Sequence, residues 1–148
     1  MTNSFESPDP NFRQCVEGFA HALPIFDHLG LRILQLEPGV CDLEFPFRRE
    51  FAAADRIFMA GAIGTAGDIA AGLAGATLLP PDWVMSTIDF TVKFVAPAIG
   101  DKVVAEGRTV RAGRSITVNA AQIYACDGNR RALCATLLMT ANNRPIKA

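Results

Sequence analysis

One carboxylate stands alone in the longest apolar stretch of the chain. Asp68 lies near the middle of the segment FMAGAIGTAGDIAAGLAGATLL (58–79), which contains no Lys or Arg and is followed by Pro80 and Pro81. A lone charge in an apolar helix is costly unless it is paired or has a function. A carboxylate that is partly shielded from water can act as a general base. We therefore interpret Asp68 as a functional residue; the alternative is a buried carboxylate that caps backbone groups or pairs with an arginine.

Other common catalytic and metal-binding patterns are absent from the sequence. The two histidines, His21 and His28, precede the core segments and are separated by Pro24, so we expect surface positions and no metal site. There is no Gly-x-Ser-x-Gly elbow, phosphate-binding loop or His-Glu-x-x-His motif. The cysteines form no Cys-x-x-Cys pair and lie in apolar surroundings, so we expect reduced thiols and no metal. They are Cys15, Cys41, Cys126 and Cys134.

The composition is that of a single globular domain. The chain has 148 residues, 50% of them hydrophobic, and its 14 basic and 15 acidic residues give a formal net charge of -1. A chain of this length can bury one core but has no room for a second domain, so we predict one domain over residues 9–148 after a disordered segment, 1–8. The near-neutral charge argues against a nucleic-acid partner. The polar N-terminus lacks signal-peptide features, so we expect a cytoplasmic protein.

Periodicity predicts two helices and six strands. Asp9 and Pro10 are typical of a helix start, and apolar residues then recur at helical spacing up to Pro24. The long segment around Asp68 predicts a second helix, and the turn at 37–39 separates two strands that should form a hairpin. The predicted strands are residues 30–37, 40–47, 84–95, 101–112, 115–126 and 131–141.

The predicted sheet must cover the long helix, because nothing else in the chain can bury its apolar surface. We therefore predict an α+β fold in which a curved antiparallel sheet of about six strands wraps around one central helix. Interior glycines each cost roughly 0.8–1.0 kcal/mol relative to alanine, so the five glycines of this helix indicate close packing. A membrane span is disfavoured because it would place Asp68 at the bilayer centre. A dinucleotide fold is disfavoured because four strands follow one another after the helix.

Three segments carry a resemblance to a known family. They are GAIGTAGDIAAGLA (61–74), STIDFTVKFVAPAIGDKVVAEGRTVRAGRSI (86–116) and IYACDGNRRALCATLLM (123–139). Their order and spacing resemble those of the hotdog-fold acyl-CoA thioesterases of the phenylacetic acid degradation protein type, in the thioesterase superfamily. That family has a glycine-led helix with an acidic residue seven positions on, and a later strand followed by Pro, Gly-Asp and a basic Gly-Arg turn. The resemblance implies a hotdog fold.

The resemblance also implies a reaction and its site. It assigns Asp68 as the catalytic carboxylate, which acts as a general base on water or as a nucleophile at the thioester carbonyl of an acyl-CoA. No cofactor is implied besides the CoA of the substrate. A backbone N–H at the helix start, from Ala60 or Gly61, would stabilise the oxyanion. Asp68 lies about 10 Å further along the same helix, too far for both to reach one carbonyl. The family builds each site across a dimer interface, so a homodimer, and further a homotetramer, is implied.

Thr87 is a further candidate, on the first strand after the long helix. It occupies a position where the family often has Ser or Thr, ten residues before a Pro. Strand alternation places it with Asp89 on a polar face, opposite Ile88 and Phe90. Its hydroxyl could hydrogen-bond a water molecule or Asp68. The alternative is an ordinary β-branched residue in a strand.

The sequence departs from the family at two polar positions. The family commonly reads His-Gly-Gly at the helix start, with an Asn six residues before the His, whereas this chain has Met59-Ala60-Gly61 and Ala53. The backbone N–H of Ala60 would remain, but the side chains that position the carbonyl or the water would not. These departures keep open a noncatalytic domain that binds acyl-CoA or another small ligand. A hotdog hydratase would need a histidine beside its carboxylate, and none lies near residues 57–68.

The basic turn after the fourth strand is a candidate for CoA binding. Arg108, Arg111 and Arg114 are possible partners for the CoA phosphates, with Gly113 shaping the turn. Met59 at the helix start completes the candidate substrate-binding residues. The alternative is that these arginines are solvated residues at strand ends.

Overall fold

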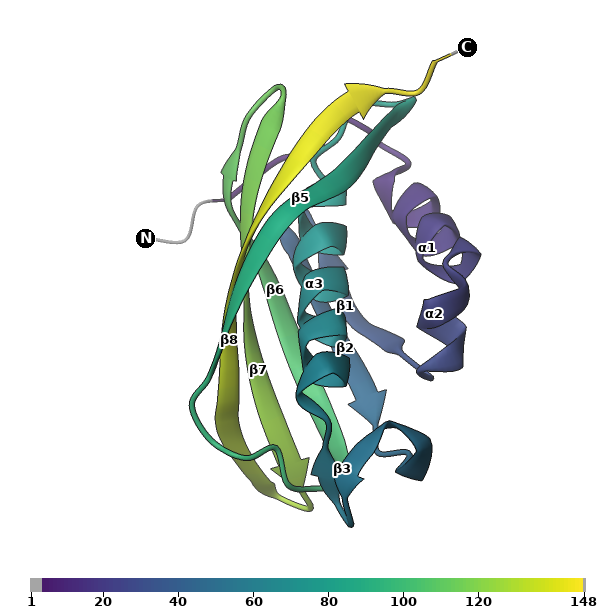
Figure 1. Cartoon of the computed structure of the whole chain (residues 1–148). Helices are drawn as coiled ribbons and strands as arrows, with labels where there is room; N and C mark the ends of the chain where they lie inside the picture. The colour runs from purple at the N-terminus through teal and green to yellow at the C-terminus, as the bar shows by residue number, and fades with distance from the viewer. Residues whose placement is uncertain (1–3, 148) are drawn as a thin grey trace.

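The computed structural model describes residues 4–147, which form one antiparallel sheet around one long helix (Figure 1). The long helix is α3 (Ala60–Ala76), and the shorter helices α1 (Phe12–Ala22) and α2 (Pro24–His28) precede the sheet in the chain. Two small strands, β3 (Ala52–Ala54) and β4 (Ile57–Phe58), follow a 3-10 turn at Arg49–Phe51 and lead into α3. The sheet consists of β1 (Arg32–Glu37), β2 (Val40–Pro46), β5 (Trp83–Phe94), β6 (Lys102–Ala112), β7 (Ile116–Asp127) and β8 (Arg130–Pro145).

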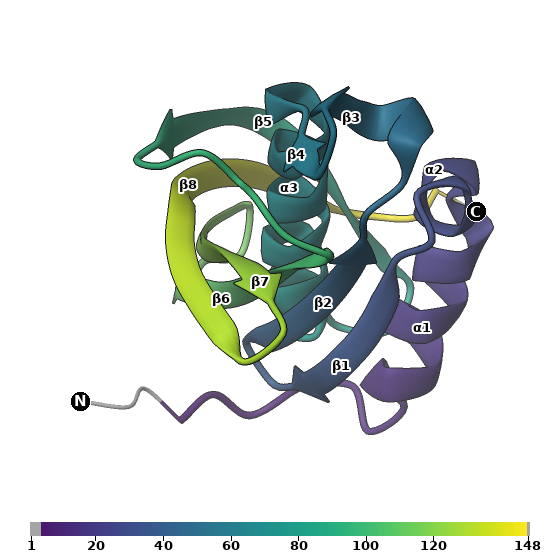
Figure 2. The same ribbon diagram turned by 90° about the horizontal axis from the view of Figure 1, so that it is seen from below.

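The six long strands lie in the order β1-β2-β6-β7-β8-β5, and each neighbouring pair is antiparallel. The strand β5 therefore stands at one edge of the sheet and β1 at the other. Figure 2 shows the sheet curving around α3, with α1 and α2 beside β1. This confirms the predicted α+β hotdog fold, in which a curved six-stranded sheet wraps around one central helix and a short N-terminal helix is added.

The core lies between α3 and the concave face of the sheet. The helix is apolar around most of its circumference, and such a helix is stable only when it is buried. On β2, Cys41, Leu43 and Phe45 are fully buried. The alternate residues Asp42 and Glu44 form ion pairs with basic side chains of the neighbouring strands. The period-2 pattern of this strand thus separates the core face from the polar face as the sequence predicts.

The helix and the sheet come very close to each other at Gly107 on β6. A Cβ atom at this position would lie 2.2 Å from the carbonyl oxygen of Ala70. On α3 itself, an added Cβ would come within 2.7 Å of a sheet side chain at Gly67 and within 2.6 Å at Gly75. The prediction that the helix glycines mark close packing is confirmed at these two positions. Gly61 takes no part in it, because no atom lies within 4 Å of its added Cβ.

The bounds of the predicted helices and strands agree with the observed ones to within four residues, but α2, β3 and β4 were not predicted. Asp9 does not cap α1. Its carboxylate accepts the N–H of Asn11 at 2.8 Å and its carbonyl accepts the N–H of Phe12 at 3.2 Å, which makes a turn before α1. The helix predicted up to Pro24 ends at Ala22. No sequence pattern indicated the separate helix α2 that begins at Pro24, where a proline fits the first turn.

The N-terminal segment was predicted to be disordered over residues 1–8, of which 1–3 lie outside the described residues. In the remainder, the Ser7 hydroxyl donates a hydrogen bond of 2.6 Å to the carbonyl of Thr77. Within residues 4–147, no helix combines the length and the hydropathy that a membrane crossing requires. The same residues contain no group of three or more His, Cys, Asp or Glu side chains that could hold a metal ion. The four cysteines are free.

Candidate active site

Chain geometry brings Asp68 on α3 next to Thr87 on β5. The turn at 77–82 reverses the chain between the two elements. Asp68 is eight residues before Ala76, which is about 12 Å along the helix. Thr87 is four residues after Trp83, which is about 13 Å along the strand. The two residues therefore lie at about the same distance from the turn. The Thr87 hydroxyl donates a hydrogen bond of 3.1 Å to Oδ1 of Asp68.

The surroundings of Asp68 favour the protonated form of its carboxyl group more than bulk water would. Burial raises the pKa of Asp68 above its ordinary value, and the hydrogen bond from Thr87 acts in the opposite direction. The ion pairs within residues 4–147 do not include Asp68. The pairing with an arginine that the sequence left open is therefore not found in this part of the chain. A carboxylate with a raised pKa and no cationic partner is a stronger base than a free aspartate.

Of the two hydrogen-bond partners predicted for the Thr87 hydroxyl, the structure confirms Asp68. The predicted grouping of Thr87 with Asp89 on one face of the strand was wrong, because β5 contains a bulge. Thr87 pairs with Ala141 and Asp89 pairs with Thr140, so Ile88 is an extra residue in the ladder. Strict alternation would place Thr87 opposite Phe90. The bulge instead turns both toward α3, where Thr87 bonds Asp68 and the ring of Phe90 lies 4.0 Å from an added Cβ at Gly64.

The start of α3 presents unbonded N–H groups, as any helix start does. Met59 is the N-cap residue and makes no side-chain cap hydrogen bond, and the first helical residues, Ala60 and Gly61, are exposed. These N–H groups are about 10 Å from Asp68 along the helix axis. Within one chain the structure therefore separates the candidate oxyanion donors from the candidate base. Ala53, where the family has Asn, is an exposed residue of β3.

A cavity of about 450 Å³ opens beside Asp68 and Thr87, between α1, α3 and β5. Its volume is within the range of small-molecule sites, about 300–1,000 Å³. Its polar lining residues are Asp9, Asp68, Asp82 and Thr87, and all others are apolar. This cavity was not predicted from the sequence. The apolar stripe of α1 predicts that this helix packs against an apolar surface, but it does not predict that the packing leaves a gap.

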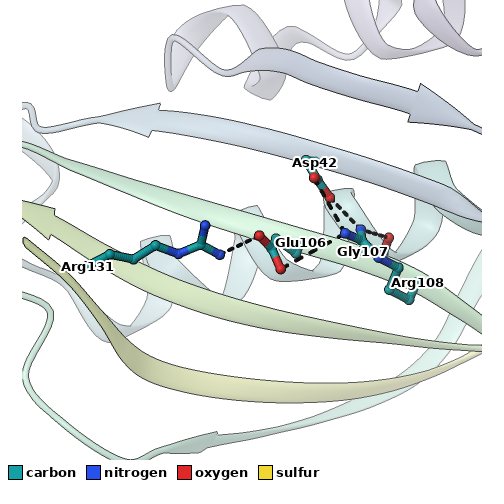
Figure 3. A network of polar contacts seen from close by, with 5 residues as sticks. All are labelled: Asp42, Glu106, Gly107, Arg108 and Arg131. Atoms are coloured by element: carbon teal, nitrogen blue, oxygen red, sulfur yellow. Dashed lines mark hydrogen bonds and ion pairs between the residues drawn. The ribbon is translucent and has the colours of Figure 1, made fainter. Parts of the chain in front are cut away.

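The arginines of the basic turn fall into two groups. Arg108 is bound to Asp42 and donates a hydrogen bond of 2.8 Å to the carbonyl of Gly107 (Figure 3). It also lies 4.0 Å from Glu106, whose other oxygen is bound by Arg131. This network holds Arg108 against the outer face of the sheet, so its cationic group is already paired.

Arg111 and Arg114 are exposed and take part in no ion pair within residues 4–147. The turn between them is tight, because the N–H of Gly113 donates to the carbonyl of Ile116 at 3.0 Å. Asn143 near the end of β8 donates a hydrogen bond of 2.9 Å to the carbonyl of Gly113. This end of the sheet is opposite the start of α3 (Figure 1). Within one chain these arginines are therefore not brought near Ala60 and Gly61.

Comparison with known proteins links this fold to one family. The sequence profile described as the thioesterase superfamily matches residues 57–132, which include α3, β5, β6, β7 and the start of β8. A protein of Saccharolobus solfataricus that is named as an esterase is 30% identical over 113 residues, which are 76% of this chain and 79% of that protein.

Solved structures of thioesterases have the same fold. A thioesterase family protein from Silicibacter pomeroyi superposes with a TM-score of 0.88 at 29% identity, covering 90% of this chain and 98% of that chain. A thioesterase from Haemophilus influenzae superposes with a TM-score of 0.77 at 16% identity, covering 98% of this chain and 95% of that chain. The second likeness is one of fold alone.

Proposed function

Since the chain belongs to the thioesterase superfamily, we propose that it hydrolyses an acyl-CoA thioester to the free acid and CoA. Membership of the superfamily indicates thioester hydrolysis in general. Our proposal goes further and includes the acyl-CoA substrate, the mechanism and the relation to the phenylacetic acid degradation protein type. The observation that carries it is the partly buried Asp68 carboxylate, which is bonded to Thr87 in the wall of an apolar cavity.

In the proposed mechanism Asp68 removes a proton from a water molecule as the water oxygen attacks the thioester carbonyl carbon. The C–S bond then breaks, and the leaving thiolate of CoA takes the proton that Asp68 has accepted. Alternatively, the Asp68 oxygen attacks the carbonyl carbon itself, the C–S bond breaks with release of the CoA thiolate, and water then hydrolyses the resulting anhydride to the free acid and the Asp68 carboxylate. In both routes the N–H of Ala60 or Gly61 stabilises the oxyanion.

The distance between base and oxyanion donor supports a shared site. One carbonyl cannot contact both Asp68 and the start of its own helix, because about 10 Å separates them. We therefore propose a homodimer that associates further into a homotetramer, in which α3 of a second copy supplies the N–H groups. The edge strand β5 is available for this contact, since Ile88, Phe90 and Phe94 are exposed apolar residues on it. Sedimentation should give a dimer or larger species, and a stable monomer at micromolar concentration would exclude the shared site.

A noncatalytic acyl-CoA or small-ligand binding domain is the second candidate. The observation that favours it is the lack of polar side chains at the helix start, where Met59 and Ala53 replace the family's His and Asn. Such a domain would bind acyl-CoA without turnover. A binding assay and a turnover assay on the same acyl-CoA separate the two functions.

The substitution Asp68→Asn tests the proposed reaction. The two side chains have nearly the same shape, but the amide can neither accept the proton nor attack the carbonyl. Release of the CoA thiol from a panel of acyl-CoA esters should fall by about 10²–10⁴-fold or more. The matched control is Glu17→Gln, because Glu17 is an exposed carboxylate on α1 that does not line the cavity. Equal turnover by parent and Asp68→Asn, with both folded by circular dichroism, would remove Asp68 from the mechanism.

A further inference from the structure

We propose that the cavity between α1, α3 and β5 binds the tail of the acyl group, and that it selects an uncharged, unbranched chain of about eight to ten carbons. This inference rests on the proposed function, since it uses Asp68 as the point where the thioester lies. It adds the substrate class, which neither the family nor the site chemistry specifies.

The first support is the position of the reactive carboxylate in the cavity wall. Asp68, Gly72 and Ala76 all line the cavity and are four residues apart, so they share one face of α3. Asp68 stands at one end of this row. Trp83, at the start of β5, lines the other end. A substrate whose carbonyl lies at Asp68 therefore has an open path along the helix toward Trp83.

The second support is the length of that path. From Asp68 to Ala76 the helix rises about 12 Å. A zigzag hydrocarbon chain advances roughly 1.25 Å per carbon, given bonds of about 1.5 Å and angles near 111°. The row of small residues therefore accommodates about nine or ten carbons in extended form. The small side chains at Gly72 and Ala76 leave this space open, because larger residues there would project into it.

The third support is the chemistry of the lining. Between the two ends the wall is apolar, with Phe12 and Phe19 from α1 on one side and Met85 from β5 on the other. Phe19 is 43% exposed, although it is one of the largest apolar side chains of α1. An acyl tail in the cavity would cover apolar surface of this kind and gain the free energy of removing it from water. The helix α1 is thus the wall that completes the site for the tail.

The far end of the cavity argues against a charged tail. Asp9, only 7% exposed, and Asp82, which precedes Trp83 in the chain, both line the cavity, and both lie close to Cys15 in its wall. A terminal carboxylate on the tail would meet these two carboxylates, and like charges at short range repel each other. The acyl groups selected are therefore monocarboxylic and not dicarboxylic.

The chain-length profile of hydrolysis is the first test. The kcat/KM values for acetyl-, butyryl-, hexanoyl-, octanoyl-, decanoyl- and hexadecanoyl-CoA should peak at octanoyl or decanoyl. Ala76→Leu should lower the ratio of decanoyl-CoA to butyryl-CoA by tenfold or more, because methylene-sized changes in an apolar pocket have effects of that order. Gly72→Ala should lower the same ratio. This variant should keep the fold, because the added methyl group would lie 3.5 Å from Cε of Met139, which is an ordinary van der Waals contact. The control is Ala22→Leu at the exposed end of α1, outside the cavity.

A binding measurement makes the test independent of turnover. Trp83 is the only tryptophan of the chain and lines the cavity, so its fluorescence reports occupancy. Titration with 1-decanol should shift the emission, 1-butanol should require a far higher concentration, and 10-hydroxydecanoate should bind at least tenfold more weakly than 1-decanol. 10-Hydroxydecanoate should bind weakly in either orientation, because its carboxylate would meet another carboxylate at each end of the cavity.

The outcomes separate the two hypotheses. A medium-chain optimum that is lost in Ala76→Leu and Gly72→Ala, together with a decanol response of Trp83, supports the inference. Hydrolysis with the same chain-length profile in all variants, or no response of Trp83 to 1-decanol, overturns it while leaving the thioesterase function in place. A decanol response without hydrolysis of any acyl-CoA overturns the proposed function and leaves the cavity as a binding site for apolar chains.

Discussion

The Thr87 hydroxyl and the Asp68 carboxylate form a hydrogen bond of 3.1 Å that joins the edge strand β5 to the central helix α3. The contact exists because the bulge at Ile88 turns Thr87 toward the helix. It is the only hydrogen bond that the structure gives to the Asp68 side chain within residues 4–147. It therefore opposes the effect of burial on the basicity of this carboxylate.

Substitution of Thr87 by valine should move the acid limb of the pH–rate profile to higher pH. Burial raises the pKa of Asp68 and the Thr87 hydrogen bond lowers it, so removal of the hydroxyl leaves burial unopposed. Because the mechanism requires the ionised carboxylate, the rate falls as pH drops through this pKa. The fall should begin at a higher pH in Thr87→Val than in the parent, as measured by kcat/KM between pH 4 and 8.

The control for this prediction is Thr91→Val on the same strand. Thr91 is exposed and lies beyond the bulge, on the face opposite Phe90. Its pH–rate profile should superpose on that of the parent. An acid limb in Thr87→Val that stays unchanged or moves to lower pH would contradict the assignment of Asp68 as the titrating base.

The folded protein should become more stable when Asp68 is replaced by asparagine at neutral pH. The folded-state pKa of Asp68 is raised by burial, so the ionised form is less favourable in the folded chain than in the unfolded one. This cost is present above the raised pKa and disappears as pH falls through it, because the folded state then binds the proton. The gain in Tm of Asp68→Asn over the parent, where 1 kcal/mol corresponds to about 2–4 °C for a chain of this size, should be largest near pH 7 and shrink toward pH 4. A gain that grows on acidification would contradict the sign of this shift.

The packing of α3 on the sheet should be most sensitive at Gly107. The Cβ of an alanine there would lie 2.2 Å from the carbonyl oxygen of Ala70, and a backbone atom cannot rotate away. We expect Gly107→Ala to destabilise the fold by at least the upper part of the usual range for overpacking, about 1–3 kcal/mol. Urea denaturation measures the loss.

A matched glycine on the surface provides the comparison. Gly18 on α1 has no atom within 4 Å of an added Cβ and lies in a helix, where alanine is favoured by about 0.8–1.0 kcal/mol. Gly18→Ala should therefore raise the urea midpoint while Gly107→Ala lowers it. A neutral effect at Gly107 would mean that helix and sheet separate more easily than the contact with Ala70 suggests.

Local patterns in the sequence were sufficient for the fold and for half of the candidate site. The apolar helix around Asp68 and the alternation of the strands are short-range signals, and they predicted the elements and their layers. The bulge at Ile88 could not be predicted, because STIDFTVKF alternates without interruption and only the pairing of Thr87 with Ala141 reveals the extra residue. The cavity could not be predicted either, because a gap in packing depends on side chains from three distant elements.

Charge at the turn between β6 and β7 should contribute to CoA affinity. Arg114 is exposed there and takes part in no ion pair within residues 4–147, so its guanidinium is available to a phosphate group. Arg114→Ala should raise the Kd for CoA several-fold at low ionic strength, and the difference from the parent should narrow as salt screens the contact. The control is Arg130→Ala, because Arg130 is an exposed arginine at the opposite end of β7, where β8 begins. Isothermal titration with CoA at two salt concentrations measures both variants. If Arg114→Ala binds CoA as the parent does at low salt, while both variants keep the fold, the phosphates are bound elsewhere on the molecule.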